Sequence, residues 1–159
     1  MLRRESVIEF ATDADVDEIG YLSKIYVEHD LGWQYTSQRI KELIRNRAKN
    51  VVVARSGDEL AGFGIMTYME ESANLDLLAV KIAYRRRGIG RQLVAWLEKV
   101  ARTAGIIYLF VQVRKMNQGA IRFYEQIGFH PIDEQSGYYR GKETGVIMCK
   151  GLREIIRTL

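Results

Sequence analysis

The sequence predicts a mixed α/β domain built on a central sheet of about seven strands. Short apolar or alternating runs bounded by turn residues occur at seven places, which is the pattern of strands. Between them, longer segments carry apolar residues every three or four positions, as amphipathic helices do. The chain has 159 residues, 47% of them hydrophobic and 28% charged, which is ordinary for one globular domain. We therefore expect a single domain over residues 1–159.

The first half of the chain predicts one strand, two helices and a hairpin. Residues 7–12 are strand-like, and Thr12 or Asp13 can cap the helix that follows by accepting a hydrogen bond from its first turn. Thr36 or Ser37 can cap the second helix in the same way. Residues 51–54 and 60–69 are predicted strands around Gly57-Asp58, a turn typical of hairpins. The helical residues expected to point inward are Val16, Ile19, Leu22, Ile25 and Tyr26 in the first helix and Ile40, Leu43 and Ile44 in the second.

The second half predicts four more strands and two helices. One helix runs from about Gly90 to Gly105, and the other runs from Gln118 to Gly128. Both end at a glycine, which can adopt the left-handed conformation of a helix C-cap. The predicted strands are residues 73–82, 108–113, 129–135 and 144–150. In the tail, Leu152, Ile155, Ile156 and Leu159 lie at helical spacing.

Residues 85–91, Arg-Arg-Arg-Gly-Ile-Gly-Arg, connect a predicted strand to a predicted helix. The first N–H groups of a helix have no partner within it, and together with the helix dipole and nearby guanidinium groups they attract an anion such as a phosphate. Gly88 and Gly90 have no Cβ, so an anion can approach the backbone. A P-loop is excluded because Gly90-Arg91-Gln92 lacks its Lys and Ser/Thr. A dinucleotide fingerprint is excluded because position 93 is Leu93 rather than Gly or Ala.

A second motif follows at residues 117–129, Asn-Gln-Gly-Ala-Ile-Arg-Phe-Tyr-Glu-Gln-Ile-Gly-Phe. The Arg-x-x-Gly-x-Gly pattern in residues 85–91 resembles the pyrophosphate-binding motif of the GNAT superfamily of acyl-CoA N-acyltransferases, and residues 117–129 resemble its second motif. The resemblance covers roughly residues 73–150. It implies a GNAT fold, with helices on both faces of a mixed central sheet, and the activity of an acetyl-CoA-dependent N-acetyltransferase.

The resemblance also implies which residues contact acetyl-CoA. Tyr124 would donate a proton to the departing thiolate, although a tyrosine that only packs would also suit its helix face. Asn117 is expected to cap its helix and to touch CoA as well. The implied CoA-binding residues are Leu78, Ala79, Val80, Arg85, Arg86, Arg87, Gly88, Ile89, Gly90, Arg91, Val111, Asn117 and Tyr124, with Gln112 beside the pantetheine arm.

At the position of the general base, this chain departs from the relatives that it resembles. Residues 109–114 and 137–139 resemble the branch that acetylates protein N-termini, including the ribosomal-protein alanine acetyltransferases. A glutamate acts as base there where this chain has Gln112, which can orient a water or the amine but cannot accept a proton at neutral pH. Asp76 is the best replacement, since strand alternation puts it on one face with Leu78 and Val80. A solvated carboxylate is the alternative for Asp76, and Glu70 and Glu71 are weaker candidates for the base.

The acceptor is expected to be a protein or peptide N-terminal α-amine, because a site with a weak base suits an amine of low pKa. Two aromatic-rich loops would line the acceptor groove, with Trp33, Tyr35, Tyr138 and Tyr139 as candidate contacts. Anchoring in the core is the alternative for Trp33. Three other functions stay open: acetylation of a small-molecule amine, a CoA-binding sensor without turnover, and a basic interaction module that contacts nucleic acid.

Composition also limits which partners, metals and cellular locations we expect. The net charge of +4 comes partly from residues 85–91, and no nucleic-acid-binding motif is present, so nucleic acid is not the expected partner. No apolar stretch reaches the ~18 residues of a membrane span. His29 and His130 lack metal-ligand spacing, so we expect no metal. Cys149 is the single cysteine, expected to be a small buried apolar residue, and a cytoplasmic location follows as the default. The sequence leaves both a monomer and a homodimer open.

Overall fold

The computed structural model describes residues 6–26, 34–137 and 143–153. The chain forms two compact units, Met1–Thr67 with Leu75–Leu97 and Tyr68–Asn74 with Glu98–Leu159, and each is described by itself. The elements in chain order are β1 Val7–Phe10, η1 Asp13–Asp15, α1 Val16–Tyr26, α2 Ser37–Arg45, β2 Lys49–Ser56, β3 Glu59–Tyr68, β4 Ser72–Val80, η2 Ile82–Tyr84, α3 Ile89–Thr103, β5 Tyr108–Arg114, α4 Gln118–Gln126, β6 His130–Gln135 and β7 Gly145–Gly151.

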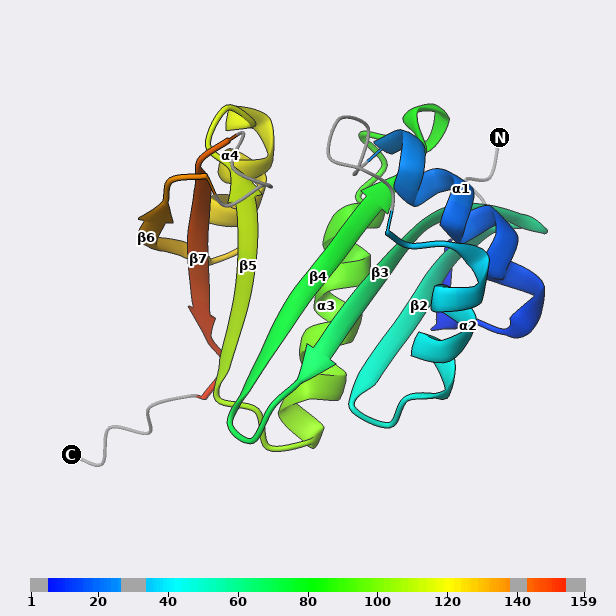
Figure 1. Cartoon of the computed structure of the whole chain (residues 1–159), viewed down its shortest axis with the longest axis horizontal. Coiled ribbons are helices and arrows are strands. Elements are labelled where there is room, and N and C mark those ends of the chain that lie inside the picture. Colours follow the sequence, from blue (N-terminus) through cyan, green and yellow to red (C-terminus); the bar gives the residue numbers. More distant parts are fainter. Residues whose placement is uncertain (1–5, 27–33, 138–142, 154–159) are drawn as a thin grey trace. The chain divides into compact units, whose positions relative to one another are not determined.

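The seven strands form one sheet in the order β1-β2-β3-β4-β5-β7-β6, which confirms the predicted fold class (Figure 1). Most element bounds differ from the sequence prediction by one or two residues, and two of these differences have a local cause. The first predicted helix begins with the 3-10 turn η1, whose Asp15 accepts a hydrogen bond from the Thr12 N–H at 2.9 Å. The fourth strand ends at Val80 because residues 82–84 form η2, in which the Tyr84 N–H donates to the Lys81 carbonyl at 2.9 Å.

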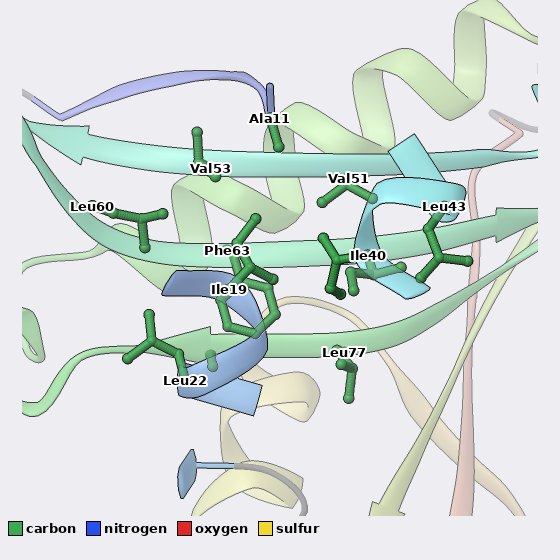
Figure 2. Packing of buried hydrophobic residues seen from close by; sticks show 12 residues of the cluster. Ala11, Ile19, Leu22, Ile40, Leu43, Val51, Val53, Leu60, Phe63 and Leu77 are labelled. Carbon is green, nitrogen blue, oxygen red and sulfur yellow. The ribbon is translucent and has the colours of Figure 1, made fainter. Parts of the chain in front are cut away.

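The core of the first unit lies between α1, α2 and the strands behind them (Figure 2). Ile19 and Leu22 of α1 and Ile40 of α2 are buried there, as predicted. The first turns of α3 cover the opposite face of these strands, so both faces carry helices (Figure 1). The expectation for Ile25 is wrong, because its side chain is 40% exposed. The buried stripe of α1 continues through Ser23, and Ile25 points away from it.

Both predicted glycine caps are confirmed by their backbone conformation and hydrogen bonds. Gly105 has a φ of 84° and Gly128 a φ of 101°, in the left-handed region. At the end of α3 the Ile106 N–H donates to the Ala101 carbonyl at 3.0 Å. At the end of α4 the Phe129 N–H donates to the Tyr124 carbonyl at 3.0 Å. Both patterns are Schellman motifs, which bring the residue after the glycine back onto the last helical turn.

The second unit contains the antiparallel strands β5, β7 and β6, with β7 in the middle. Every residue of β6 is exposed, as suits a strand at the edge of the sheet. Cys149 on β7 is half-buried rather than buried as predicted, because it lies on the half-exposed face of the strand. Burial raises the pKa of its thiol, which disfavours the nucleophilic thiolate. Leu152 is buried, whereas the rest of the predicted helical tail lies outside the described residues.

Within the described ranges, no helix is both long enough and apolar enough to cross a lipid bilayer.

One ion pair in the second unit is largely shielded from water. The Lys150 Nζ lies 2.8 Å from the Glu98 carboxylate, and their side chains are 22% and 9% exposed. The Arg102 guanidinium is 4.0 Å from the same carboxylate. A buried charge that loses its partner keeps its desolvation cost, so this contact should matter for stability.

We expect Lys150→Met to lower the free energy of unfolding by about 1–3 kcal/mol, because Glu98 would keep only the more distant Arg102 as a partner. Urea denaturation followed by circular dichroism measures this change. Lys99→Met is the matched control, since Lys99 is exposed on the same helix and its loss should stay within about 0.5 kcal/mol. Equal effects of the two substitutions would contradict a stabilising role for the pair.

Candidate functional site

The loop of residues 85–91 lies in the first unit and leads into α3. The first hydrogen bond of this helix joins the Gln92 N–H to the Gly88 carbonyl at 3.0 Å, so the helix begins about one residue earlier than predicted. The N–H groups of Gly88, Ile89, Gly90 and Arg91 precede that bond and are not used within the helix. Gly88 has a φ of 78°, and a Cβ placed there would meet no atom within 4 Å. The backbone is therefore open to a ligand at this point.

Arg86 adds a feature that the sequence analysis missed. Its φ is 63°, so a non-glycine residue occupies the left-handed region two positions before Gly88. Such a conformation is uncommon for a long side chain and costs free energy. Residues held this way cluster at ligand-binding loops, where the surrounding structure maintains the strain.

Two arginines of the loop are held by neighbouring aromatic rings. Arg85 donates from Nε to the Val80 carbonyl at 3.1 Å, and its guanidinium lies 5.5 Å from the centre of the Tyr26 ring. Arg87 lies 5.4 Å from the centre of the Tyr84 ring. The Tyr84 hydroxyl in turn hydrogen-bonds Glu59, and this bond raises the pKa of Tyr84. Both cations are thus partly ordered, which reduces the entropy lost when an anion binds.

The half-buried face of β4 carries the predicted base. Burial alternates along the strand, with Asp76, Leu78 and Val80 half-buried and Ala79 buried, so the predicted alternation is confirmed. The Asp76 carboxylate accepts a hydrogen bond from the Thr67 hydroxyl on β3. Thr67 Oγ1 also accepts a bond from Lys49 Nζ on β2 at 2.7 Å. Asp76 is therefore not a simple solvated carboxylate but belongs to a polar chain across three strands.

Gln112 on β5 forms a reciprocal amide pair with Asn74. The Asn74 Nδ2 donates to Gln112 Oε1 at 3.0 Å, and the Gln112 Nε2 donates to Asn74 Oδ1 at 2.7 Å. Each amide has two N–H groups and two lone-pair positions, of which the pair uses one of each kind. The Gln112 side chain is held in position, and it has a second N–H with which to bind.

The second motif forms α4 and its two ends in the second unit. Asn117 caps the helix, because its side chain accepts a hydrogen bond from the Ala120 N–H at 3.0 Å. Tyr124 is 6% exposed, and its ring makes edge contacts with Phe123 and Phe129 at centroid distances of 5.0 Å and 5.3 Å. The Phe129 contact belongs to the Schellman motif, which typically brings two such residues together. The spacing Tyr-x-x-x-Gly-Phe therefore has a direct structural cause.

The remaining candidates are dispersed. Val111 is buried on β5 opposite Met148 of β7, and Glu70 and Glu71 are exposed. Tyr35 packs against the core of the first unit and has the Arg39 guanidinium 5.1 Å from its ring centre. Trp33, Tyr138 and Tyr139 lie outside the described residues.

Three polar residues at the site escaped the sequence analysis: Lys49, Thr67 and Asn74. Asn74 could have been found, because it lies two positions before Asp76 and alternation puts both on one face. The pairing of Lys49 with Thr67 could not have been found from the sequence, because a β-bulge next to Ala54 shifts the register of the hairpin.

Comparison with known proteins agrees with this architecture. [Ribosomal protein bS18]-alanine N-acetyltransferase of Salmonella typhimurium strain LT2 is 35% identical over 95 residues, which span 58% of this chain and 64% of that enzyme. The crystal structure of the ribosomal-protein-S18-alanine N-acetyltransferase from Escherichia coli has a TM-score of 0.82 at 23% identity, covering 98% of this chain and 99% of that one.

A third protein, the PaiA N-acetyltransferase of Thermoplasma acidophilum in complex with coenzyme A, has a TM-score of 0.78 at 21% identity, covering 92% of this chain and 99% of that one. The two solved structures establish the likeness of fold. The model of the Acetyltransferase (GNAT) family matches residues 9–129, which is most of the sequence. The chain therefore belongs to the GNAT family.

Proposed function

We propose that this enzyme transfers the acetyl group of acetyl-CoA to the N-terminal α-amine of a protein or peptide. The observation that carries the acceptor class is the predicted base itself: Asp76 is the carboxylate among the side chains of β4, and it accepts a hydrogen bond from Thr67. On β5 the other candidate, Gln112, is an amide bonded to Asn74. Aspartates have a reference pKa of ~3.9, far below that of any amine, so an aspartate as base suits an amine that loses its proton easily.

The energetic difference between acceptors is large. At pH 7 a lysine side chain with a pKa of ~10.4 needs about 4.6 kcal/mol to become neutral, whereas an α-amine with a pKa of ~7.7–8.0 needs about 1.0–1.4 kcal/mol. Without a strong base, an enzyme would therefore be slowed far less with an α-amine as acceptor than with a lysine side chain. The Salmonella relative is an alanine N-acetyltransferase of ribosomal protein bS18, which supports the same class of acceptor.

The loop into α3 is proposed to hold the pyrophosphate of CoA. The N–H groups of residues 86–91 lie at or before the first turn of the helix, and Arg85 and Arg87 are ordered beside them. The pantetheine arm would pair with the backbone of residues 78–80 and lie near Val111 and Gln112. Asn117 would add a side-chain contact, since its Oδ1 caps α4 while its amide N–H groups can bind a ligand.

The proposed reaction assigns one proton to each catalytic group. The neutral amine attacks the thioester carbonyl carbon, a C–N bond forms, and the thiolate of CoA leaves with the electrons of the C–S bond. Asp76 accepts the proton that the amine loses, and the Tyr124 hydroxyl protonates the thiolate. Gln112 would hold the amine or a water with the N–H that Asn74 does not use.

We also propose that the whole chain forms a single domain and that the protein is located in the cytoplasm.

A thiol-release assay with acetyl-CoA tests the function directly. We expect turnover with peptides bearing a free N-terminus and little with N-terminally blocked lysine peptides, spermidine or an aminoglycoside. The rate should rise with pH through the range where the α-amine becomes neutral, near ~7.7–8.0. Faster turnover with spermidine or the aminoglycoside would show that the acceptor is a small-molecule amine and not a protein N-terminus. Acetyl-CoA binding without turnover on any amine would indicate a sensor.

Gly90→Val should weaken acetyl-CoA binding strongly, because the added side chain would project from the first turn of α3 where the pyrophosphate is proposed to lie. Isothermal titration calorimetry measures the affinity. Ala95→Val is the matched control, since it places the same β-branched residue on an exposed position of the same helix. A folded Gly90→Val protein that binds as tightly as the control would rule out the assigned phosphate site.

Tyr124→Phe should keep the fold and the acetyl-CoA affinity, because the ring still packs between Phe123 and Phe129. General acid catalysis is typically worth ~10²–10⁴-fold, so kcat should fall by about that factor. Steady-state kinetics together with calorimetry separates the two effects. Phe123→Leu serves as a control for packing. A fall in kcat below about threefold, well short of that range, would leave Tyr124 as a packing residue.

A further inference from the structure

A chain of three polar side chains crosses adjacent strands of the first unit. Lys49 and Thr67 are direct partners in the β2–β3 register, and Asp76 lies on the neighbouring strand β4. All three residues are half-buried. Lys49 Nζ is 2.7 Å from Thr67 Oγ1, and the Thr67 hydroxyl is hydrogen-bonded to the Asp76 carboxylate.

The direction of the hydrogen bonds in this chain follows from the chemistry of the groups. A lysine ammonium carries three donors and no acceptor, so Thr67 Oγ1 must accept from Lys49. The hydroxyl has a single proton, which it therefore donates to Asp76. The carboxylate oxygen is an acceptor in this contact and is held in one orientation. The ammonium and the carboxylate are separated by one hydroxyl group.

We propose that Thr67 is a positioning residue for the general base and that Lys49 is a specificity residue that disfavours cationic acceptors. This proposal rests on the function proposed above, in which Asp76 accepts the amine proton. The Thr67 hydroxyl holds one oxygen of the Asp76 carboxylate and thereby fixes the orientation of the group toward the acceptor. Lys49 offsets the charge of Asp76 next to the acceptor, so a substrate with additional positive charges is not attracted.

Acceptors differ in the charges that they carry besides the reacting amine. A carboxylate alone would attract any polycation, including a polyamine or a lysine-rich peptide. The Lys49 ammonium, one hydroxyl away, repels such a polycation and weakens that attraction. A peptide N-terminus attached to neutral residues brings no further charge and is affected least. Selectivity for such an N-terminus would then follow from repulsion of the competing amines.

The first test separates positioning from fold. Thr67→Val replaces the hydroxyl by a methyl group of the same shape and should lower kcat for an N-terminal peptide by about 10²-fold, the typical loss for a misplaced catalytic group, with little change in KM. Thr67→Ser retains the hydroxyl and should restore most of the activity. Equal kcat values for the valine and serine variants would overturn the positioning role.

The second test measures specificity. Lys49→Met removes the ammonium and keeps an unbranched side chain that is one atom shorter, and it should lower KM for spermidine by about tenfold relative to a neutral N-terminal peptide. Lys49→Arg keeps the charge and should keep the wild-type ratio. Lys99→Met, at an exposed position on α3, controls for the change in net charge. An unchanged ratio in Lys49→Met would overturn the specificity role.

A measurement without turnover separates failure of this inference from failure of the proposed function. The Thr67 hydroxyl proton should give a slowly exchanging resonance in the NMR spectrum of the resting protein, absent in Thr67→Val and shifted in Asp76→Asn. A missing resonance in the wild type overturns the hydrogen-bond chain, whatever the activity. If the resonance is present but no amine is acetylated, the chain of hydrogen bonds stands and the proposed function fails. If Asp76→Asn loses activity while Thr67→Val has the wild-type activity, Asp76 remains the general base and the positioning role of Thr67 is overturned.

Discussion

The register between β2 and β3 is the constraint on which the candidate base depends. A turn at Gly57 joins the strands, and Ser56 pairs with Glu59 next to it. One residue further along, the pairing shifts: Arg55 lies opposite Leu60, but Ala54 lies opposite Gly62. The bulge inserts one residue and thereby moves every later side chain of β3 relative to β2. Only with that shift does Lys49 face Thr67, whose hydroxyl reaches Asp76.

A second constraint acts at the ends of the helices. Gly128 closes α4 in a Schellman motif that turns the chain so that Phe129 packs on Tyr124. At the other end, Asn117 satisfies an N–H group of the first turn. The residues that identify the family in this helix therefore also form its two caps. At Asn117 and Tyr124 these structural roles coincide with the proposed roles in CoA binding and in proton transfer, so substitutions there need separate measurements of stability and turnover.

The loop before α3 combines three properties that each favour a bound anion. The helix supplies N–H groups that it does not use itself, the backbone at Gly88 is open, and the guanidinium groups of Arg85 and Arg87 are held over aromatic rings. The left-handed conformation of Arg86 adds strain that is tolerated where the loop is shaped for a ligand. Preorganisation of this kind lowers the entropic cost of binding.

The sequence by itself determined the seven strands, the helices, the glycine caps and the two motifs, because these features depend on periodicity and on residues a few positions apart. It also determined that Asp76 shares a face with Leu78 and Val80, since alternation along one strand is local.

The tertiary structure alone decided what surrounds Asp76. Counting outward from the Gly57 turn without the bulge would place Lys49 opposite Met66, whereas the structure places it opposite Thr67. The pairing of Gln112 with Asn74 also joins residues far apart in the chain, 38 positions in this case, and strand order rather than local pattern brings them together. Half-burial of Cys149 and exposure of Ile25 were likewise decided by packing, because hydrophobic character does not specify which face of an element a neighbour will cover.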